Sequence, residues 1–288
     1  MTSGPVIGTS ILRKEDRRFL TGRGTYVADI ERPGMTFGVF VRSPHAHARI
    51  RAIDSTAALA LPGVLAVLTG EDIKRDGVGG IPCGWCVTGK GGVPMKEPPH
   101  PALAQGKIRH VGDPVAFVMA NTLAAARDAA AAVVVDYESL PPVTSLRSAL
   151  EAGAPAVFDE IPDNICYEWE LGDREATEAA FKRAHHVAQI KLVNNRLVGN
   201  PMEPRAAIGE YDPATAQHTL WTTSQFPHIV KLLMGNFVLK IPQHKLRVIA
   251  PDVGGGFGVK QFHYAEEAVV TWASSKMGRP VKWVCETQ

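Results

Sequence analysis

The stretch that most constrains this chain is 252–260, DVGGGFGVK, in which three consecutive glycines, a phenylalanine and a fourth glycine follow one another. It lies between an apolar run at 246–250 and a helical pattern at 264–277. Glycine lacks a Cβ, so such a stretch can adopt positive φ and bring its backbone amides close to a ligand. At a strand-to-helix turn these amides also lie near the positive end of the helix dipole, which suits an anion. The stretch therefore predicts an anion or cofactor cradle, with a flexible turn as the alternative.

Two common nucleotide-binding motifs do not match this stretch. A Walker phosphate loop needs Gly-Lys followed by Ser or Thr, whereas the chain has Val259-Lys260-Gln261. The dinucleotide fingerprint needs a third glycine where Val259 stands. A nucleotide-binding module is therefore a disfavoured hypothesis, and the cradle is of another kind.

Composition limits the function classes further. A chain of 288 residues has room for roughly two domains, and 45% hydrophobic with 21% charged residues is typical of a soluble globular protein. A net charge of +2 provides no electrostatic basis for binding nucleic acid or an anionic membrane. The N-terminus lacks the pattern of a signal peptide, and no apolar run is long enough to span a bilayer. We expect a cytoplasmic protein.

The first part of the chain predicts a compact α+β domain that ends near residue 143. A polar, basic arm precedes it and is expected to lie on another surface. Strands are predicted at 35–42, 48–53, 64–69, 115–119 and 133–137, the last of them buried, with a helix from 123 that Asn121-Thr122 can cap. The Pro141-Pro142 pair then breaks the chain, and a linker with two prolines follows.

The second part predicts a hairpin and one complete strand–loop–helix unit. The expected elements are a helix from 173 to 184, a partly alternating strand at 187–197, a hairpin of 206–211 with 218–223, a helix from Pro227, a strand at 246–250, a helix ending at Gly278 and a strand from 280. The final strand has no obvious partner left in the chain, so we expect either a truncated chain or a second polypeptide that completes the sheet.

Several other residues could in principle bind a metal or catalyse a reaction, but we expect them to have structural roles. Cys83 and Cys86 have the spacing of a redox or metal pair, but no second pair accompanies them, so we expect two reduced thiols in a loop. His45 and His47 are expected to be structural. Glu266 and Glu267, at the start of a helix, are expected to be caps or surface residues. An interaction between Glu203 and Arg205 is only a guess.

Several segments match one family jointly. They are FLTGRGTYVADI (19–30), VRSPHAHARI (41–50), LPGV (61–64), GDPV (112–115), NPMEPR (200–205), TTSQ (222–225) and the glycine stretch. This ordered series resembles the N-terminal part of the molybdopterin-binding large subunit of the molybdenum hydroxylases, the xanthine dehydrogenase, aldehyde oxidase and carbon monoxide dehydrogenase family. The resemblance extends over nearly the whole chain.

The resemblance implies a fold of the α+β (α/β) class. It places an a/b hammerhead domain at 20–142, after an N-terminal arm at 1–19. A linker at 143–165 leads to 166–288, the beginning of the first molybdopterin-binding domain.

The implied activity is oxidation of an aldehyde, an N-heterocycle or carbon monoxide, with water as the oxygen source. The implied cofactor is molybdenum-molybdopterin, with its cytosine dinucleotide form included, while a [2Fe-2S] cluster and FAD belong to partner subunits. The implied partners are the remainder of the molybdopterin-binding subunit, an iron–sulfur subunit and an FAD subunit. The alternative is a catalytically inactive, truncated scaffold or interaction subunit that binds no cofactor.

The resemblance also assigns roles to single residues. Gln225 matches a glutamine that donates a hydrogen bond to an oxygen ligand of molybdenum, and Gly255, Gly256, Phe257 and Gly258 match the loop that approaches the cofactor. Phe257 and Gln261 are expected to border the substrate pocket. Members that act on purines carry glutamate at the position of Gln261, so a purine is disfavoured. The family's catalytic glutamate lies beyond Gln288, no residue here is a direct metal ligand, and this chain alone is not expected to turn over substrate.

Overall fold

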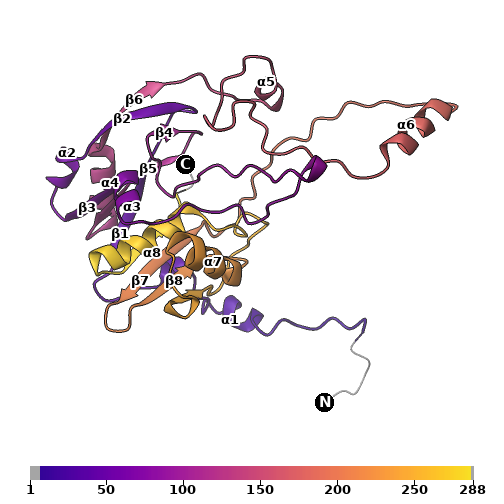
Figure 1. Ribbon diagram of the computed structural model, residues 1–288. Coiled ribbons are helices and arrows are strands. Elements are labelled where there is room, and N and C mark those ends of the chain that lie inside the picture. The colour runs from indigo at the N-terminus through magenta and orange to yellow at the C-terminus, as the bar shows by residue number, and fades with distance from the viewer. Residues whose placement is uncertain (1–6, 287–288) are drawn as a thin grey trace.

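The computed structural model describes residues 7–286, which form two β-sheets with helices around them and a long limb that extends from the body (Figure 1). The first part contains α1 (Asp16–Leu20), η1 (Val27–Asp29), β1 (Thr36–Arg42), β2 (Ala48–Asp54), α2 (Thr56–Leu59), β3 (Val64–Thr69), α3 (Gly70–Arg75), η2 (Lys90–Gly92), β4 (Lys107–Ile108), β5 (Pro114–Ala120), α4 (Leu123–Ala132) and β6 (Val134–Ser139). The second contains α5 (Leu146–Ala149), α6 (Arg174–Arg183), β7 (Ala206–Asp212), β8 (Gln217–Thr222), α7 (Pro227–Leu233), η3 (Met234–Val238), η4 (Gln243–Lys245), β9 (Leu246–Ile249), α8 (Ala265–Met277) and β10 (Val281–Val284).

The larger sheet joins the two parts of the chain. Its seven strands lie in the order β3-β5-β1-β10-β7-β8-β9. The last strand, β10, runs parallel to β1, with Val281 opposite Thr36, and antiparallel to β7, with Val281 opposite Gly209. The expectation that this strand lacks partners within the chain is therefore wrong. Its partner β1 lies so far back in the sequence that no local pattern reveals the pairing.

The smaller sheet consists of β4, β2 and β6. Strand β6 lies at its edge and alternates between exposed and half-buried positions, so the prediction of a buried strand there is wrong. A short apolar run does not distinguish an edge strand from a central one, because burial depends on what covers each face.

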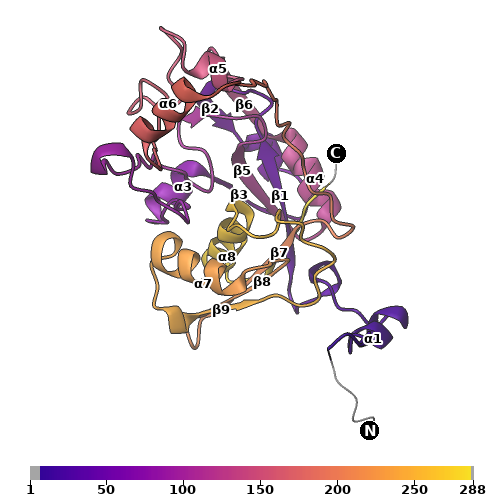
Figure 2. The same ribbon diagram turned by 90° about the vertical axis from the view of Figure 1, so that its right-hand side faces the viewer.

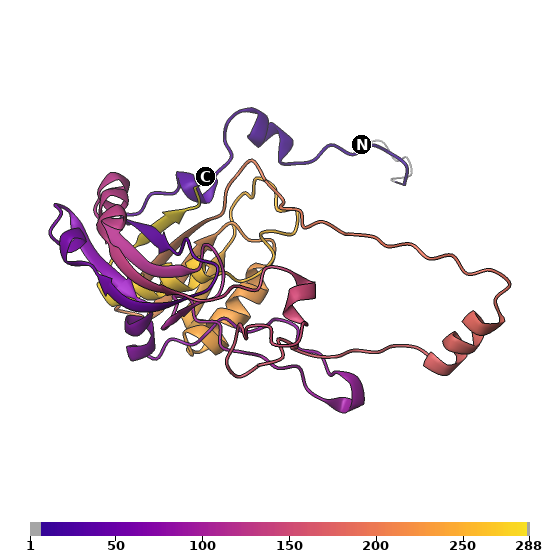
Figure 3. The same ribbon diagram turned by 90° about the horizontal axis from the view of Figure 1, so that it is seen from above.

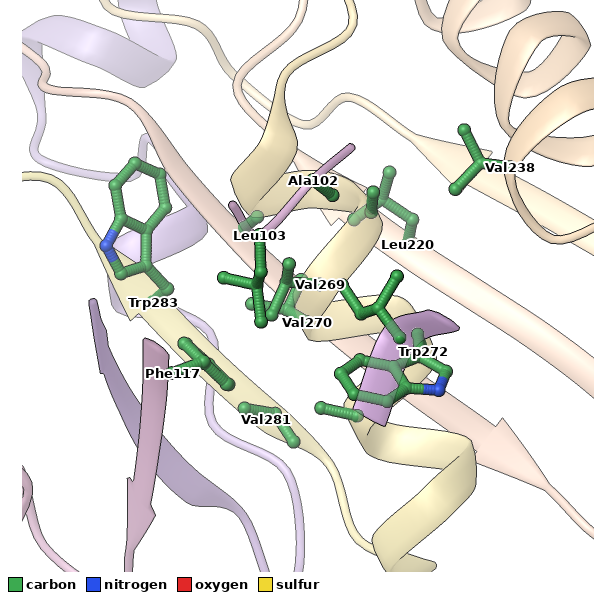
Figure 4. Close-up of a cluster of buried hydrophobic side chains, with 14 of the residues drawn as sticks. Ala102, Leu103, Phe117, Leu220, Val238, Val269, Val270, Trp272, Val281 and Trp283 are labelled. Atoms are coloured by element: carbon green, nitrogen blue, oxygen red, sulfur yellow. The ribbon is translucent and has the colours of Figure 1, made fainter. Parts of the chain in front are cut away.

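Helix α8 is the centre of the core. Its residues Glu266–Ser274 are all buried, and it packs on β7, β8 and β10. Figure 2 shows the large sheet between α8 on one side and α4 on the other. Figure 4 shows Val269, Val270 and Trp272 of α8 among side chains of the sheet, including Phe117 and Leu220. The glycine stretch is thus followed by a helix that is buried over most of its length.

Close packing between β7 and α8 requires glycine at 209, and this leads to a first prediction. A Cβ at Gly209 would lie 2.1 Å from the carbonyl oxygen of Val270, a backbone atom that cannot move aside. We expect Gly209→Ala to lower the free energy of unfolding by about 1–3 kcal/mol, as overpacking does, measured by chemical denaturation. Gly84→Ala is the control, since its Cβ would meet only Leu233 Cδ1, at 4.0 Å. Equal stability of the two variants would contradict the prediction.

The limb consists of α6 and the extended segments on either side of it (Figure 3). Helix α6 confirms the helix expected from 173, and the Asp173 side chain accepts a hydrogen bond from the Ala176 N–H at 2.8 Å. The strand predicted at 187–197 is absent, because these described residues pair with no other strand. The arm forms the short helix α1 where no helix was expected.

Candidate functional site

The glycine stretch forms the centre of an irregular loop between β9 and α8. Gly255 and Gly258 have φ of 94° and 83°, which glycine adopts without strain, and Phe257 also has a positive φ of 49°. Helix α8 begins only at Ala265. The glycine amides therefore do not lie at the helix N-terminus, and the predicted contribution of the helix dipole to this loop is wrong.

Gln225, which follows β8, lies directly on this loop. Its Oε1 accepts hydrogen bonds from the N–H groups of Gly258, at 3.0 Å, and Lys260, at 3.3 Å. Its own N–H donates to the Lys260 carbonyl at 2.8 Å. A Cβ at Gly256 would lie 2.4 Å from Gln225 Cδ, so glycine is needed there for this contact. Because two N–H groups occupy Oε1, the amide orientation is set and Nε2 is the group left to donate outward.

The same loop also carries an aromatic residue, Phe257. The Phe257 side chain is 77% exposed, although large apolar side chains are usually covered. Gln261, half-buried, follows on the same loop, and its N–H donates to the Gly258 carbonyl at 3.4 Å. The structure thus brings together the six residues that the resemblance assigned to the cofactor loop and the substrate pocket: Gln225, Gly255, Gly256, Phe257, Gly258 and Gln261. Their contacts with a cofactor or a substrate remain predictions.

A buried ion pair between Lys260 and Glu203 fixes the glycine loop to the residues that precede β7. Lys260 is 1% exposed, and its Nζ donates to Glu203 Oε2 at 2.8 Å. The same oxygen accepts the Gly254 N–H at 2.7 Å, so one carboxylate anchors both ends of the glycine stretch. The other oxygen, Oε1, is buried and has no hydrogen-bond partner among the described residues. Sequence reasoning did not identify this pair, and the lysine that closes the glycine stretch was its only signal.

The start of the loop is tied to the N-terminal arm. Asp252 accepts hydrogen bonds from the Arg18 guanidinium of α1 and from the Thr25 N–H, the latter at 2.8 Å. The Arg18 hydrogen bond is the main reason that the pKa of Asp252 lies below its usual range, and the Thr25 N–H adds to it. The surface that this arm contacts is the glycine-loop region of its own chain.

A second, partly buried network of charged residues connects α8 to the loop. The Glu266 carboxylate accepts hydrogen bonds from Arg42, at 2.6 Å, and Arg205, at 2.9 Å. Burial acts to raise the pKa of Glu266, but the charges and hydrogen bonds of Arg205 and Arg42 outweigh it, and the pKa is lowered. Arg205 also stacks on the Tyr264 ring at 3.9 Å, and the Tyr264 hydroxyl donates to the Val259 carbonyl of the loop at 2.7 Å.

Two expectations about carboxylates are thereby corrected. Glu266 is 3% exposed and Glu267 is 5% exposed, so neither is a surface residue. Glu267 is nevertheless a cap, as expected, because it accepts the Tyr264 N–H at 3.0 Å, and it also accepts the Thr222 hydroxyl. The guessed contact of Glu203 with Arg205 is wrong, since each pairs with a residue far away in the chain.

The remaining nominated residues lie away from the loop. His47 Nδ1 lies 2.9 Å from the Pro141 carbonyl oxygen, and the His45 ring packs on Tyr137, which agrees with structural roles. Cys83 and Cys86 are exposed free thiols. Within residues 7–286, no three His, Cys, Asp or Glu side chains gather in a way that would hold a metal ion. No helix in the same range has the length and hydropathy that crossing a membrane requires.

Two family models match the chain in order. The aldehyde oxidase and xanthine dehydrogenase a/b hammerhead domain matches residues 21–141, and the molybdopterin cofactor-binding domain matches residues 157–288. The chain belongs to the molybdenum hydroxylase family. The predicted fold class is confirmed: a hammerhead domain precedes part of a molybdopterin-binding domain.

Two relatives of this molybdenum hydroxylase chain are described as a large chain and a large subunit. It is 39% identical to the carbon monoxide dehydrogenase large chain of Afipia carboxidovorans over 96% of its own length and 34% of the relative's. It is 38% identical to the nicotine 6-hydroxylase large subunit of Paenarthrobacter nicotinovorans, over 97% of this chain and 33% of that one. The chain thus spans about a third of the length of these curated relatives.

Solved structures agree with these matches. Quinoline 2-oxidoreductase from Pseudomonas putida 86 superimposes with a TM-score of 0.84 at 38% identity, covering 97% of this chain and 34% of that one. The Cu,Mo-CO dehydrogenase superimposes with a TM-score of 0.87 at 37% identity, covering 97% and 35%.

Proposed function

We propose that this chain is the N-terminal portion of the molybdopterin-binding subunit of a molybdenum hydroxylase and contributes one wall of its cofactor site. The observation that carries the proposal is the position of Gln225. Its carbonyl oxygen accepts hydrogen bonds from the Gly258 and Lys260 N–H groups, which leaves Nε2 free to donate to a ligand, and Phe257 on the same loop is 77% exposed. The proposed domain organisation is an arm at 1–19, a hammerhead domain at 20–142, a linker at 143–165 and a cofactor-binding domain at 166–288. Residues 1–6 of the arm and 287–288 of the last domain lie outside the described residues.

The residues present fit molybdenum-molybdopterin. When bound, this group supplies two-electron oxidation of a carbon substrate with oxygen from water. Gln225 offers a neutral donor, which orients an oxygen ligand without adding charge to the metal site. Gly255, Gly256 and Gly258 let the loop backbone approach closely, since no Cβ intervenes. Phe257 offers an apolar face to substrate. Acid–base chemistry would come from the catalytic glutamate expected outside this chain.

The substrate class is part of the proposal. The relatives are described by their names as acting on carbon monoxide, nicotine and quinoline. We propose an aldehyde, an N-heterocycle or carbon monoxide for this chain, and Gln261 in place of glutamate argues against a purine. An iron–sulfur subunit, an FAD subunit and the remainder of the cofactor-binding subunit are the proposed partners, and the cytoplasm is the proposed location.

Gln225→Ala provides the test of this function. The tagged chain is co-expressed with the polypeptides encoded beside it, and molybdenum and pterin are assayed in the purified complex. The wild-type complex is expected to contain both, and the variant to lose roughly 10–100-fold in metal affinity or activity, as when outer-shell hydrogen bonds are removed. Gln243→Ala, which alters a glutamine in the η4 turn, is the control.

Two outcomes would contradict the proposal. A wild-type complex that contains its partners but neither molybdenum nor pterin would favour the inactive scaffold. Equal cofactor content and activity in the Gln225 and Gln243 variants would remove Gln225 from the site.

A further inference from the structure

The returning half of the limb, residues 186–198, is extended chain that no other element covers (Figures 1 and 3). Within residues 7–286, no backbone N–H or C=O of this segment has a hydrogen-bond partner. Water satisfies these groups while they are exposed, but in contact with another protein surface each of them would need a partner.

The side chains of this segment are unusual for a solvent-exposed loop. Its large apolar residues are 51% to 92% exposed, and they are Val187, Ile190, Leu192, Val193, Leu197 and Val198. Soluble monomers seldom expose a contiguous apolar patch without a function for it, and such patches mark interaction sites. The segment therefore has the composition of a surface that another protein covers.

The order of these residues specifies how the segment would be covered. In an extended chain, alternate side chains point to opposite faces, so Ala188, Ile190 and Leu192 share one face while Gln189 and Lys191 share the other. Apolar residues alternating with polar ones are typical of a half-buried strand, and Val and Ile favour that conformation. The segment thus combines strand-forming side chains with an unpaired backbone.

The end of the segment lies against the cofactor loop. A Cβ at Gly199 would lie 3.1 Å from Val259 Cγ1 and 3.3 Å from Phe257 Cβ. A partner that pairs with the 198 end of the segment therefore comes close to the loop that carries Gly255–Gly258. A partner that lies along this strand is placed to complete the same site.

We propose that residues 186–198 add as a strand to a sheet edge of the polypeptide that corresponds to the roughly two thirds of the relatives' length lying outside the match. This inference rests on the proposed function. A second copy of this chain fits less well, because two identical segments would form only a two-stranded ribbon, which is marginally stable in water.

The test co-expresses the tagged chain with the carboxyl-terminal remainder of the Afipia carboxidovorans carbon monoxide dehydrogenase large chain. The amount of that remainder captured on the tag and the amide hydrogen exchange of residues 186–198 are measured. We expect capture, and slower exchange across the segment than in the chain alone.

Variants separate the contributions of the apolar face and of the backbone. Ile190→Lys with Leu192→Lys is expected to reduce capture by roughly tenfold or more, since it places charges in a buried apolar face. Gln189→Lys with Asn195→Lys adds the same charge on the opposite face and should leave capture unchanged. Lys191→Pro removes a ladder N–H and should reduce capture, whereas Lys191→Ala should not. These positions are exposed, so thermal melting of the chain alone should not change.

Each contrary outcome is distinguishable. Absence of capture, equal capture by the two lysine pairs, or protection of the segment by dimerisation of this chain alone would overturn the docking proposal. Molybdenum and pterin in the captured complex are assayed separately. Suppose that the remainder is captured and residues 186–198 are protected from exchange, but that the complex contains no cofactor. This result would contradict the proposed function and would still support the docking proposal.

Discussion

Replacement of Lys260 by methionine is expected to lower the free energy of unfolding by about 3–5 kcal/mol, the cost of removing one partner from a buried ion pair. The Lys260 side chain is fully buried and that of Glu203 is 9% exposed, so water cannot solvate the carboxylate that remains. Its Oε1 already lacks a partner among the described residues, and its Oε2 would keep only the Gly254 N–H. The effect is measured by urea denaturation.

A double variant tests this explanation. Lys260→Met combined with Glu203→Gln removes both charges, and we expect it to be more stable than Lys260→Met alone, because no buried charge is left unpaired. Lys276→Met is the control, since the Lys276–Asp76 pair is 26% exposed on each side and such pairs contribute about 0–1 kcal/mol. If Lys260→Met and Lys276→Met had equal effects, the buried pair would not stabilise the loop.

Glu266→Gln is expected to have the second-largest effect, about 2–3 kcal/mol. It leaves Arg205 and Arg42 without their carboxylate, but their side chains are 24% and 36% exposed, so water offsets part of the cost of a buried pair. Because Arg205 stacks on Tyr264, whose hydroxyl donates to Val259, faster hydrogen exchange in the glycine loop should accompany the loss.

The pH dependence of this effect follows from the lowered pKa of Glu266. A carboxyl group with a lower pKa in the folded state stabilises the protein fully above its unfolded pKa of about 4.3, and this stabilisation is lost as the pH falls through the folded value. The difference in unfolding free energy between wild type and Glu266→Gln should therefore be constant from pH 7 to about pH 5 and shrink in more acidic solution. A difference that grows on acidification would contradict this assignment.

Local chemistry explains the elements that the sequence predicted well. Helix α4 begins where Thr122 Oγ1 accepts the Ala125 N–H at 3.1 Å, and α8 ends at Gly278 with φ of 65°. The hairpin of β7 and β8 flanks the expected turn, and α7 begins at Pro227. In each case the signal lies within a few residues of the structure it specifies.

Distant pairings explain the failures. Strand β10 is central because β1 and β7 flank it, and the 187–197 strand is absent because none of the described residues pairs with it. Glu266 is buried because Arg42, which precedes it by 224 positions, comes to meet it. Hydrophobic patterns report what a segment can form, but the choice of partner depends on the packing of the whole chain.

The glycine loop illustrates both what the sequence determines and what the tertiary structure determines. The sequence by itself determined that 252–260 has the freedom to approach a ligand, and, through the ordered motifs, that Gln225 and Phe257 belong with it. Only the tertiary structure decided that the Gln225 carbonyl is bound by two loop N–H groups, that its Nε2 is therefore the outward donor, and that Glu203 and Lys260 hold the loop from beneath. The physical reason is that conformational freedom is a property of each glycine, whereas the direction of a hydrogen bond depends on groups brought together by folding.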